Sequence, residues 1–292
     1  MTGINLALDH IGVAVSSLDV AHETYSRLGF RLTSRSIHSG SREAGGAVEP
    51  WGSGNHCAMF EQGYLELIGI TDPQLYTSVR DLIDKYEGAH IIALGVEDSD
   101  TAYEVINGRS GLVQPAAKLE RMAPFGPNGD EERLAQFRNI HAFSDKVPEG
   151  RMIFIEHLTR DVLWQDHLLE HPNGAVAIAE TAVCVADLTA TCSRFSAMFG
   201  VEPSADGSDV AVYDLGNTRI YVLTEAGLAK WAPGVTARAL PWVAGFGVRV
   251  KDLAVTRSYL QVQGFTTNDH PYPAVWLGPD ATLGVVLSFM QA

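Results

Sequence analysis

Two strand-like segments near the N-terminus each carry one side chain of a type that binds divalent metals. Residues 8–15 contain His10, and residues 63–68 contain Glu66. Both segments are apolar and rich in β-branched residues, as strands are. Because side chains alternate along a strand, His10 shares its face with two very small residues, which indicates a lined cavity. The alternative is a core histidine and an edge-strand glutamate that never meet.

The elements that must position these two residues follow the order strand, helix and three strands. The first strand precedes a helix that continues to residue 28, and Gly29 ends it. Strands are predicted over residues 30–36, 55–61 and 63–70. The glycine-rich stretch 38–54 is too long for a hairpin turn, which leaves a functional lid or a disordered loop.

The same order recurs three more times, with first strands that begin near residues 92, 181 and 245. The chain is therefore predicted to be an α+β protein of four βαβββ modules. We expect an N-terminal domain over residues 1–165, a linker over 166–174 that contains the breaker His-Pro-Asn-Gly, and a C-terminal domain over 175–292.

Composition narrows the class of partner. A net charge of −14 without a Lys/Arg-rich run argues against nucleic acid and anionic membranes. The three cysteines show no metal-binding or disulfide spacing, which fits a reducing cytoplasm. Neither a signal peptide nor a membrane span is expected. A small-molecule substrate is the expected partner, and a homodimer is left open.

Several motifs resemble those of the vicinal oxygen chelate superfamily, and more narrowly its glyoxalase-like subgroup. They are Leu-Asp-His-Ile-Gly-Val-Ala-Val (8–15), Gly-Ser-Gly-Asn-His (52–56), Gly-Tyr-Leu-Glu-Leu-Ile (63–68), Phe-Ile-Glu-His-Leu (154–158) and His-Pro-Asn-Gly (171–174). The resemblance implies that modules pair into two domains, each with a curved, half-open mixed sheet of eight strands. It also implies a divalent metal on the inner face, held by the first and last strands of each module.

Carried over residue by residue, the resemblance assigns His10, Glu66 and Glu156 as metal ligands. Ungapped alignment places Ile91 opposite His10, so His90, one residue away, joins the set only through a β-bulge. Such ligands suit manganese, iron, cobalt, nickel, zinc or magnesium. In the C-terminal half Glu180 and Gly245 stand at the first-strand positions, so no metal is expected there.

A metal with open positions would orient two neighbouring substrate oxygens and acidify the adjacent C–H bond. The resemblance then implies Glu156 as the proton-transferring base, and His56 is a second catalytic candidate beside the glycine-rich stretch. The predicted function is a metal-dependent lyase, isomerase or epimerase acting on a small oxygenated metabolite. One alternative is a metal-free protein that binds a small molecule or sequesters an antibiotic. A second is an extradiol-type dioxygenase, disfavoured because its C-terminal ligands are missing.

Overall fold

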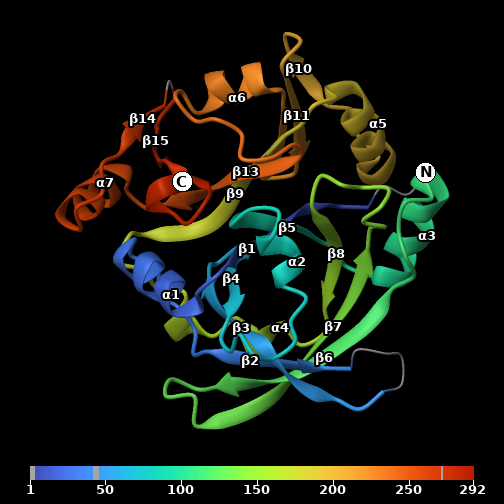
Figure 1. Cartoon of the computed structure of the whole chain (residues 1–292), viewed down its shortest axis with the longest axis vertical. Coiled ribbons are helices and arrows are strands. Elements are labelled where there is room, and N and C mark those ends of the chain that lie inside the picture. The colour runs from blue at the N-terminus through green and yellow to red at the C-terminus, as the bar shows by residue number, and fades with distance from the viewer. Residues whose placement is uncertain (1–3, 42–45, 271) are drawn as a thin grey trace.

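The computed structural model describes residues 4–41, 46–270 and 272–292 of the chain. In these residues 16 strands form one mixed sheet that does not close on itself, and seven α-helices pack beside it (Figure 1). The predicted α+β class is confirmed. Within the same residues no helix is long and apolar enough to cross a membrane.

The N-terminal half runs twice through a strand, a helix and three strands. The first run contains β1 (Ala7–Val15), α1 (Leu18–Arg27), β2 (Ser36–Gly40), β3 (Glu49–Met59) and β4 (Tyr64–Ile70), followed by the short helix α2 (Arg80–Ile83). The second contains β5 (Gly88–Gly95), α3 (Ser99–Ser110), β6 (Ala117–Phe125), β7 (Glu131–His141) and β8 (Arg151–His157). The short helices α4 (Arg160–Leu163) and η1 (Asp166–Leu168) lead into the second half.

The C-terminal half has the same order, with shorter strands. Its first run contains β9 (Ala175–Cys184), α5 (Leu188–Phe199), β10 (Ser204–Asp206), β11 (Val210–Leu215) and β12 (Thr218–Leu223), followed by α6 (Glu225–Trp231). Its second run contains β13 (Trp242–Val250), α7 (Leu253–Val262), β14 (Asn268–Asp269), β15 (Ala274–Leu277), η2 (Pro279–Ala281) and β16 (Val286–Gln291).

The stretch predicted as a long glycine-rich loop is mostly strand. β2 pairs with β3 from Ser36↔Asn55 to Gly40↔Glu49, so this stretch forms a long antiparallel ribbon. Residues 42–45, between the two strands in sequence, lie outside the described residues. Small residues let the two strands approach closely: a Cβ on Gly54 would meet the Ser36 carbonyl oxygen at 2.5 Å.

The helices α1, α3, α5 and α7 each follow a residue whose side chain caps the first turn. The capping side-chain oxygen accepts a hydrogen bond from a backbone N–H of the first turn, which would otherwise lack a partner. The caps are Ser17 for α1, Asp98 for α3, Asp187 for α5 and Asp252 for α7. The recurrence of Ser or Asp just after each first strand therefore has a direct physical role.

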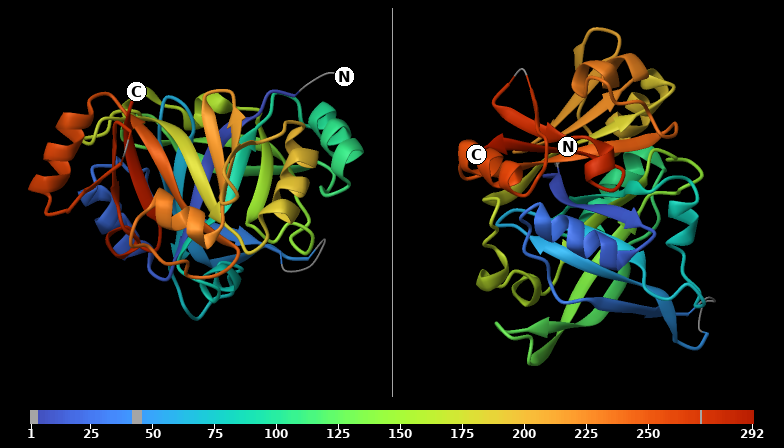
Figure 2. Two further views of the ribbon diagram at one scale, coloured as in Figure 1. Left: turned by 90° about the horizontal axis from the view of Figure 1, so that it is seen from above. Right: turned by 60° about the vertical axis from the view of Figure 1, so that its left-hand side comes forward.

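The strand β1 lies at the centre of the N-terminal half. It pairs in parallel with β4 and antiparallel with β5. The two halves join where β5 meets β13, at the single pair Val243↔Ala89. The strands therefore form one continuous sheet rather than the two separate eight-stranded sheets that the resemblance implied, and both halves curve away from this junction (Figure 2).

Residues of both halves share one apolar core. Phe30, after α1, stacks on Phe289 of β16 with ring centroids 6.0 Å apart. The connection between the halves is anchored by Asn173, which is completely buried. Its Nδ2 donates to the Leu28 carbonyl at 2.9 Å, and its Oδ1 accepts from Ala175 N at 3.0 Å. The division into domains at residues 166–174 stays a prediction.

Replacing Asn173 with alanine should lower the free energy of unfolding by about 2–4 kcal/mol, because it leaves two buried backbone groups without a partner. Chemical denaturation monitored by circular dichroism measures this, with the exposed Asn128→Ala as the matched control. A loss for Asn173→Ala no larger than that of the control would show that the junction does not depend on this side chain.

Candidate functional site

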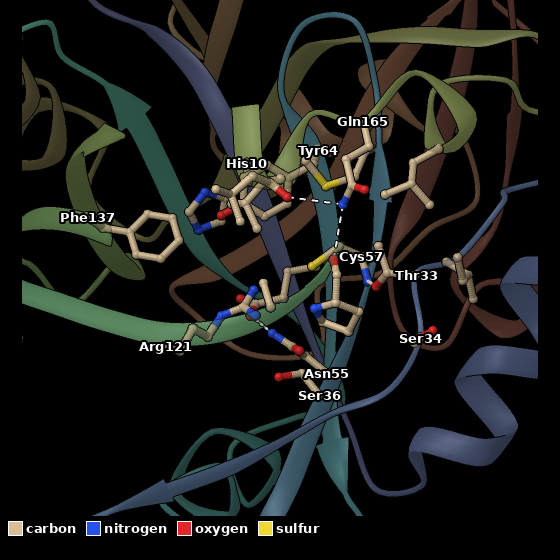
Figure 3. A pocket seen from close by; sticks show the side chains of 18 of the residues that line it. His10, Thr33, Ser34, Ser36, Asn55, Cys57, Tyr64, Arg121, Phe137 and Gln165 are labelled. Atoms are coloured by element: carbon tan, nitrogen blue, oxygen red, sulfur yellow. Dashed lines mark hydrogen bonds between the residues drawn. The ribbon is translucent and has the colours of Figure 1, made fainter. Parts of the chain in front are cut away.

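The inner face of the N-terminal strands lines a cavity of about 490 Å3 (Figure 3). Residues that line it belong to all the strands from β1 to β8, to the segment 31–34, and to the region of α4 and η1. Its polar lining includes His10, Asn55, Cys57, Tyr64, Glu66 and Arg121, and its apolar lining includes Ile91, Phe137, Ile153 and Ile155. The structure thus brings His10 and Glu66, two of the predicted site residues, to one pocket.

His10 is held by its own neighbour in the chain. The pairing of β1 with β5 shifts register between Leu8 and His10, and at this irregularity the Asp9 carboxylate reaches the ring of His10. His10 Nδ1 lies 2.8 Å from Asp9 Oδ1 and donates to it, because a carboxylate can only accept. The ring stacks on Tyr64 with centroids 4.4 Å apart. In the neutral ring this arrangement fixes the tautomer, with the proton on Nδ1 and Nε2 as the acceptor.

Asp9 holds a second histidine as well. His157 Nε2, at the end of β8, lies 3.0 Å from Asp9 Oδ2 and donates to it. Burial alone would raise the pKa of the Asp9 carboxyl, but the hydrogen bonds from His10 and His157 outweigh it and hold this pKa well below its usual range. The sequence did not indicate that Asp9 bonds two histidines, because simple alternation turns Asp9 away from His10. The only signal was an acidic residue inside an apolar strand.

Glu66 is positioned from the neighbouring strand. Asn55 Nδ2, on β3, donates to Glu66 Oε1 at 2.6 Å, and both residues line the pocket. Cys57 lies opposite Glu66 in the β3–β4 ladder. Burial, and then the charge of Glu66, raise the pKa of the Cys57 thiol to about 12, so this cysteine is not a thiolate nucleophile at neutral pH.

Glu156 does not join His10 and Glu66, which corrects the expectation that it binds metal or acts as the base. Its Oε2 accepts hydrogen bonds from the backbone N–H and the hydroxyl of Ser99, at 3.0 and 2.7 Å. Ile155 lines the pocket, so alternation turns Glu156 to the other face of β8. The observed register explains the error. Gly12 pairs with Glu66 in the first module, and Ala93 pairs with Ile153 in the second.

His90 and His56 also lie outside the pocket. His90 Nε2 donates to the Tyr86 carbonyl at 2.8 Å, and the two rings stack with centroids 4.0 Å apart. The β1–β5 pairing does shift register at His90, between the pairs Gly12↔Ile91 and Val13↔Ala89, yet Ile91 and not His90 lines the pocket. His56 Nδ1 donates to the Thr33 carbonyl at 2.7 Å. Its neighbours in β3, not His56 itself, face the cavity.

The donor set does not fit the metal centre that the resemblance implies. Of the first- and last-strand positions that would supply ligands, His10 and Glu66 hold donors, while Ile91 and Ile153 hold hydrocarbon. Across the described residues no group of three or more histidine, cysteine, aspartate or glutamate side chains can hold a metal ion. Catalytic metals in proteins ordinarily have three protein ligands. His10 and Glu66 alone fall short of that number.

Comparison with known proteins identifies a family and several structures of similar fold. Residues 8–205 match the model of a family described as glyoxalase-like domain, which confirms the resemblance. No protein of curated function matches the chain.

Two solved structures match nearly the whole chain and most of their own length. A hypothetical protein from Staphylococcus aureus has a TM-score of 0.63 at 12% identity, covering 98% of this chain and all (100%) of that one. A triple mutant of 4-hydroxymandelate synthase from Streptomyces coelicolor has a TM-score of 0.59 at 11% identity, covering 99% and 93%.

A third solved structure matches over part of its length. It is described as a xylose isomerase-like TIM barrel/4-hydroxyphenylpyruvate dioxygenase fusion protein. Its TM-score is 0.57 at 12% identity, over 98% of this chain and 49% of that one. At such identities these likenesses show the fold alone.

Replacing Asp9 with asparagine should lower the free energy of unfolding at pH 7 by about 2–4 kcal/mol, because the two histidines lose a charged acceptor. The pKa of Asp9 is depressed in the folded chain and lies near 4 in the unfolded chain. Its contribution is therefore present above about pH 4 and is lost as the pH falls through the folded value.

The difference between wild type and Asp9→Asn should accordingly shrink below about pH 4. Urea unfolding at a series of pH values measures it. A difference that stays constant between pH 7 and pH 3 would contradict the assignment of a charged, hydrogen-bonded carboxylate.

Proposed function

The chain belongs to the family of glyoxalase-like domain proteins, and on this premise we propose that its N-terminal pocket is the active site of a lyase or isomerase. The substrate is a small oxygenated organic molecule. The reaction is transfer of a proton on a carbon next to a carbonyl group, with His10 as the acid–base group. His10 and Glu66 are too few to hold a catalytic metal, which favours a reaction in which side chains, rather than a divalent metal, stabilise the negative charge that develops on the substrate.

The hydrogen bond between His10 and Asp9 carries this proposal. A carboxylate on Nδ1–H orients the imidazole and stabilises the imidazolium that forms when Nε2 takes a proton. His10 is 5% exposed and lines the pocket, so bulk water has little access to it. A histidine held in this way is a general base and, after proton uptake, a general acid.

Removal of a proton next to a carbonyl group builds negative charge on the carbonyl oxygen, and the pocket offers groups that stabilise it. Burial and nearby negative charges, first that of Asp9, raise the pKa of Tyr64 well above its usual range, so its hydroxyl stays protonated. Arg121 contributes a positive charge from β6. Return of the proton to another carbon gives isomerisation, return to the opposite face gives epimerisation, and loss of a leaving group gives elimination.

The second candidate is a protein that binds a small molecule without transforming it. The apolar wall formed by Ile91, Phe137, Ile153 and Ile155 favours it, because such a surface holds an apolar body without chemistry. The extradiol-type dioxygenase is supported only by the fold shared with a solved structure whose description includes a dioxygenase. Its metal ligands are missing from the described part of the C-terminal half.

Exchange of carbon-bound hydrogen tests the proposal without knowledge of the product. The protein is incubated in D2O with a panel of 2-oxo and 2-hydroxy acids, and deuterium uptake is followed by NMR. We expect at least one compound to exchange, and His10→Gln to slow the exchange by about 10²- to 10⁴-fold. Treatment with a chelator should leave the rate unchanged.

The matched control is Glu156→Gln, which removes the carboxylate first expected to act as the base and should keep the wild-type rate. Equal rates for wild type and His10→Gln would disprove the assignment of the base. Loss of exchange after chelation, restored by a divalent metal, would support a metal-dependent mechanism instead. Binding without exchange of any compound would favour the second candidate.

A further inference from the structure

The pocket is positively charged, although the whole chain carries a net charge of −14. Among the described residues that line it are the three arginines Arg31, Arg121 and Arg151, against the single carboxylate Glu66. Arg31 is exposed, while Arg121 and Arg151 are half-buried, and a positive charge there is costly unless an opposite charge compensates it. An excess of arginine inside a pocket of an acidic protein therefore points to an anionic ligand.

One of the three arginines is hydrogen-bonded within the protein, and a second lies near a carboxylate. Arg31 donates to the Glu170 carbonyl oxygen at 2.9 Å. Arg121 makes no hydrogen bond or ion pair within the described residues, but it lies near the carboxylate of Glu66, since both charges act on Cys57 and Tyr64.

Arg151 has no such compensation. In the described part of the chain its guanidinium makes no hydrogen bond or ion pair. The nearby Glu149 accepts hydrogen bonds from Thr191, at 2.9 Å, and from Arg194 instead.

Two more polar side chains lie beside Arg151 on the same face. Arg151 and Ile153 both line the pocket from β8, and His141 of β7 pairs with Ile153. Residues at such diagonal positions lie about 7–8 Å apart at Cα, within reach of long side chains. The imidazole of His141 has no hydrogen bond within the described residues. Burial, and then the charge of Arg151, lower the pKa of His141, so it is neutral at pH 7.

Asn139, two residues before His141, completes the group. It pairs with Ile155, lines the pocket and is only 8% exposed. Its Oδ1 is buried without a hydrogen-bond partner. An unpaired buried acceptor of this kind is unfavourable unless a ligand supplies a donor. A hydroxyl group is the natural donor.

We propose that Arg151, His141 and Asn139 form the recognition subsite for a 2-hydroxy carboxylate. Arg151 binds the carboxylate through two parallel N–H groups, His141 donates a further hydrogen bond, and Asn139 accepts from the neighbouring hydroxyl. Ile91 and Ile153 pack against the apolar body of the molecule. One uncompensated guanidinium matches a single negative charge, which favours a carboxylate over a doubly charged phosphate. This inference rests on the proposed function, because it assigns the substrate class of that same pocket.

Ligand binding tests the subsite independently of turnover. The probes are 2-hydroxy acids from lactate to 2-hydroxy-4-phenylbutanoate, each with its uncharged primary amide, its 2-deoxy acid and its phosphonate analogue. We expect at least one 2-hydroxy acid to bind wild type at least tenfold more tightly than its amide. Arg151→Gln should weaken that acid by about 10- to 100-fold and leave the amide unchanged.

Arg151→Lys keeps the charge but loses the paired N–H groups, so it should lie between wild type and Arg151→Gln. The matched control is Arg138→Gln. Arg138 is bound to Asp100 on the opposite face of β7 and should not affect any probe. Asn139→Leu should reduce the preference for a 2-hydroxy acid over its 2-deoxy acid. Thermal unfolding verifies that each variant is folded.

The inference is wrong if no acid of the panel binds more tightly than its amide, or if Arg151→Gln weakens acid and amide equally. Tighter binding of a phosphonate than of its carboxylate would contradict the carboxylate assignment. If acids bind through Arg151 but no compound exchanges hydrogen, the subsite stands and the proposed chemistry fails. If hydrogen exchange depends on His10 but not on Arg151, the chemistry stands and the subsite fails.

Discussion

The buried carboxylate of Asp9 is the constraint on which the site depends. It accepts hydrogen bonds from His10, its neighbour in β1, and from His157 at the end of β8. These strands belong to different modules of the N-terminal half, so one side chain ties the modules together beneath the pocket. An ionised carboxylate is tolerated at this depth because both of its oxygens are bonded. The same carboxylate also orients His10, which lines the cavity, so a change at Asp9 affects both the packing of the modules and the position of His10.

The positive charge of the pocket comes from its arginine side chains, and the positions of a metal-ligand set are only half filled. Ile91 and Ile153 hold two of the positions at which the resemblance implied ligands, and Arg151 lies next to Ile91 across the β5–β8 ladder. Arginine provides a permanent charge with directional N–H groups, and hydrocarbon lies at the neighbouring positions. In the function that we propose, such a pocket recognises an anion and stabilises developing negative charge, which are tasks that a metal performs elsewhere.

Element order was predictable from the sequence because it depends on local signals: apolar strands, Ser or Asp caps such as Ser17 and Asp98, and a glycine after the first helix. Strand register was not, because it depends on pairing between distant segments. A displacement of three residues put Glu156 at the place of Ile153. A local irregularity brought Asp9 to His10, where alternation alone separates them. The uncompensated charge of Arg151 emerges only once β5, β7 and β8 are placed together.

The protonation of His10 tests the central claim most directly. Nitrogen-15 NMR of histidine-labelled protein at pH 8 distinguishes the two tautomers of the ring, and Asp9→Asn assists the assignment of His10. The hydrogen bond to Asp9 predicts that Nδ1 carries the proton, that Nε2 is unprotonated, and that stoichiometric zinc leaves both resonances in place. A proton on Nε2, or a shift of the Nε2 resonance that saturates at one equivalent of zinc, would contradict a metal-independent base.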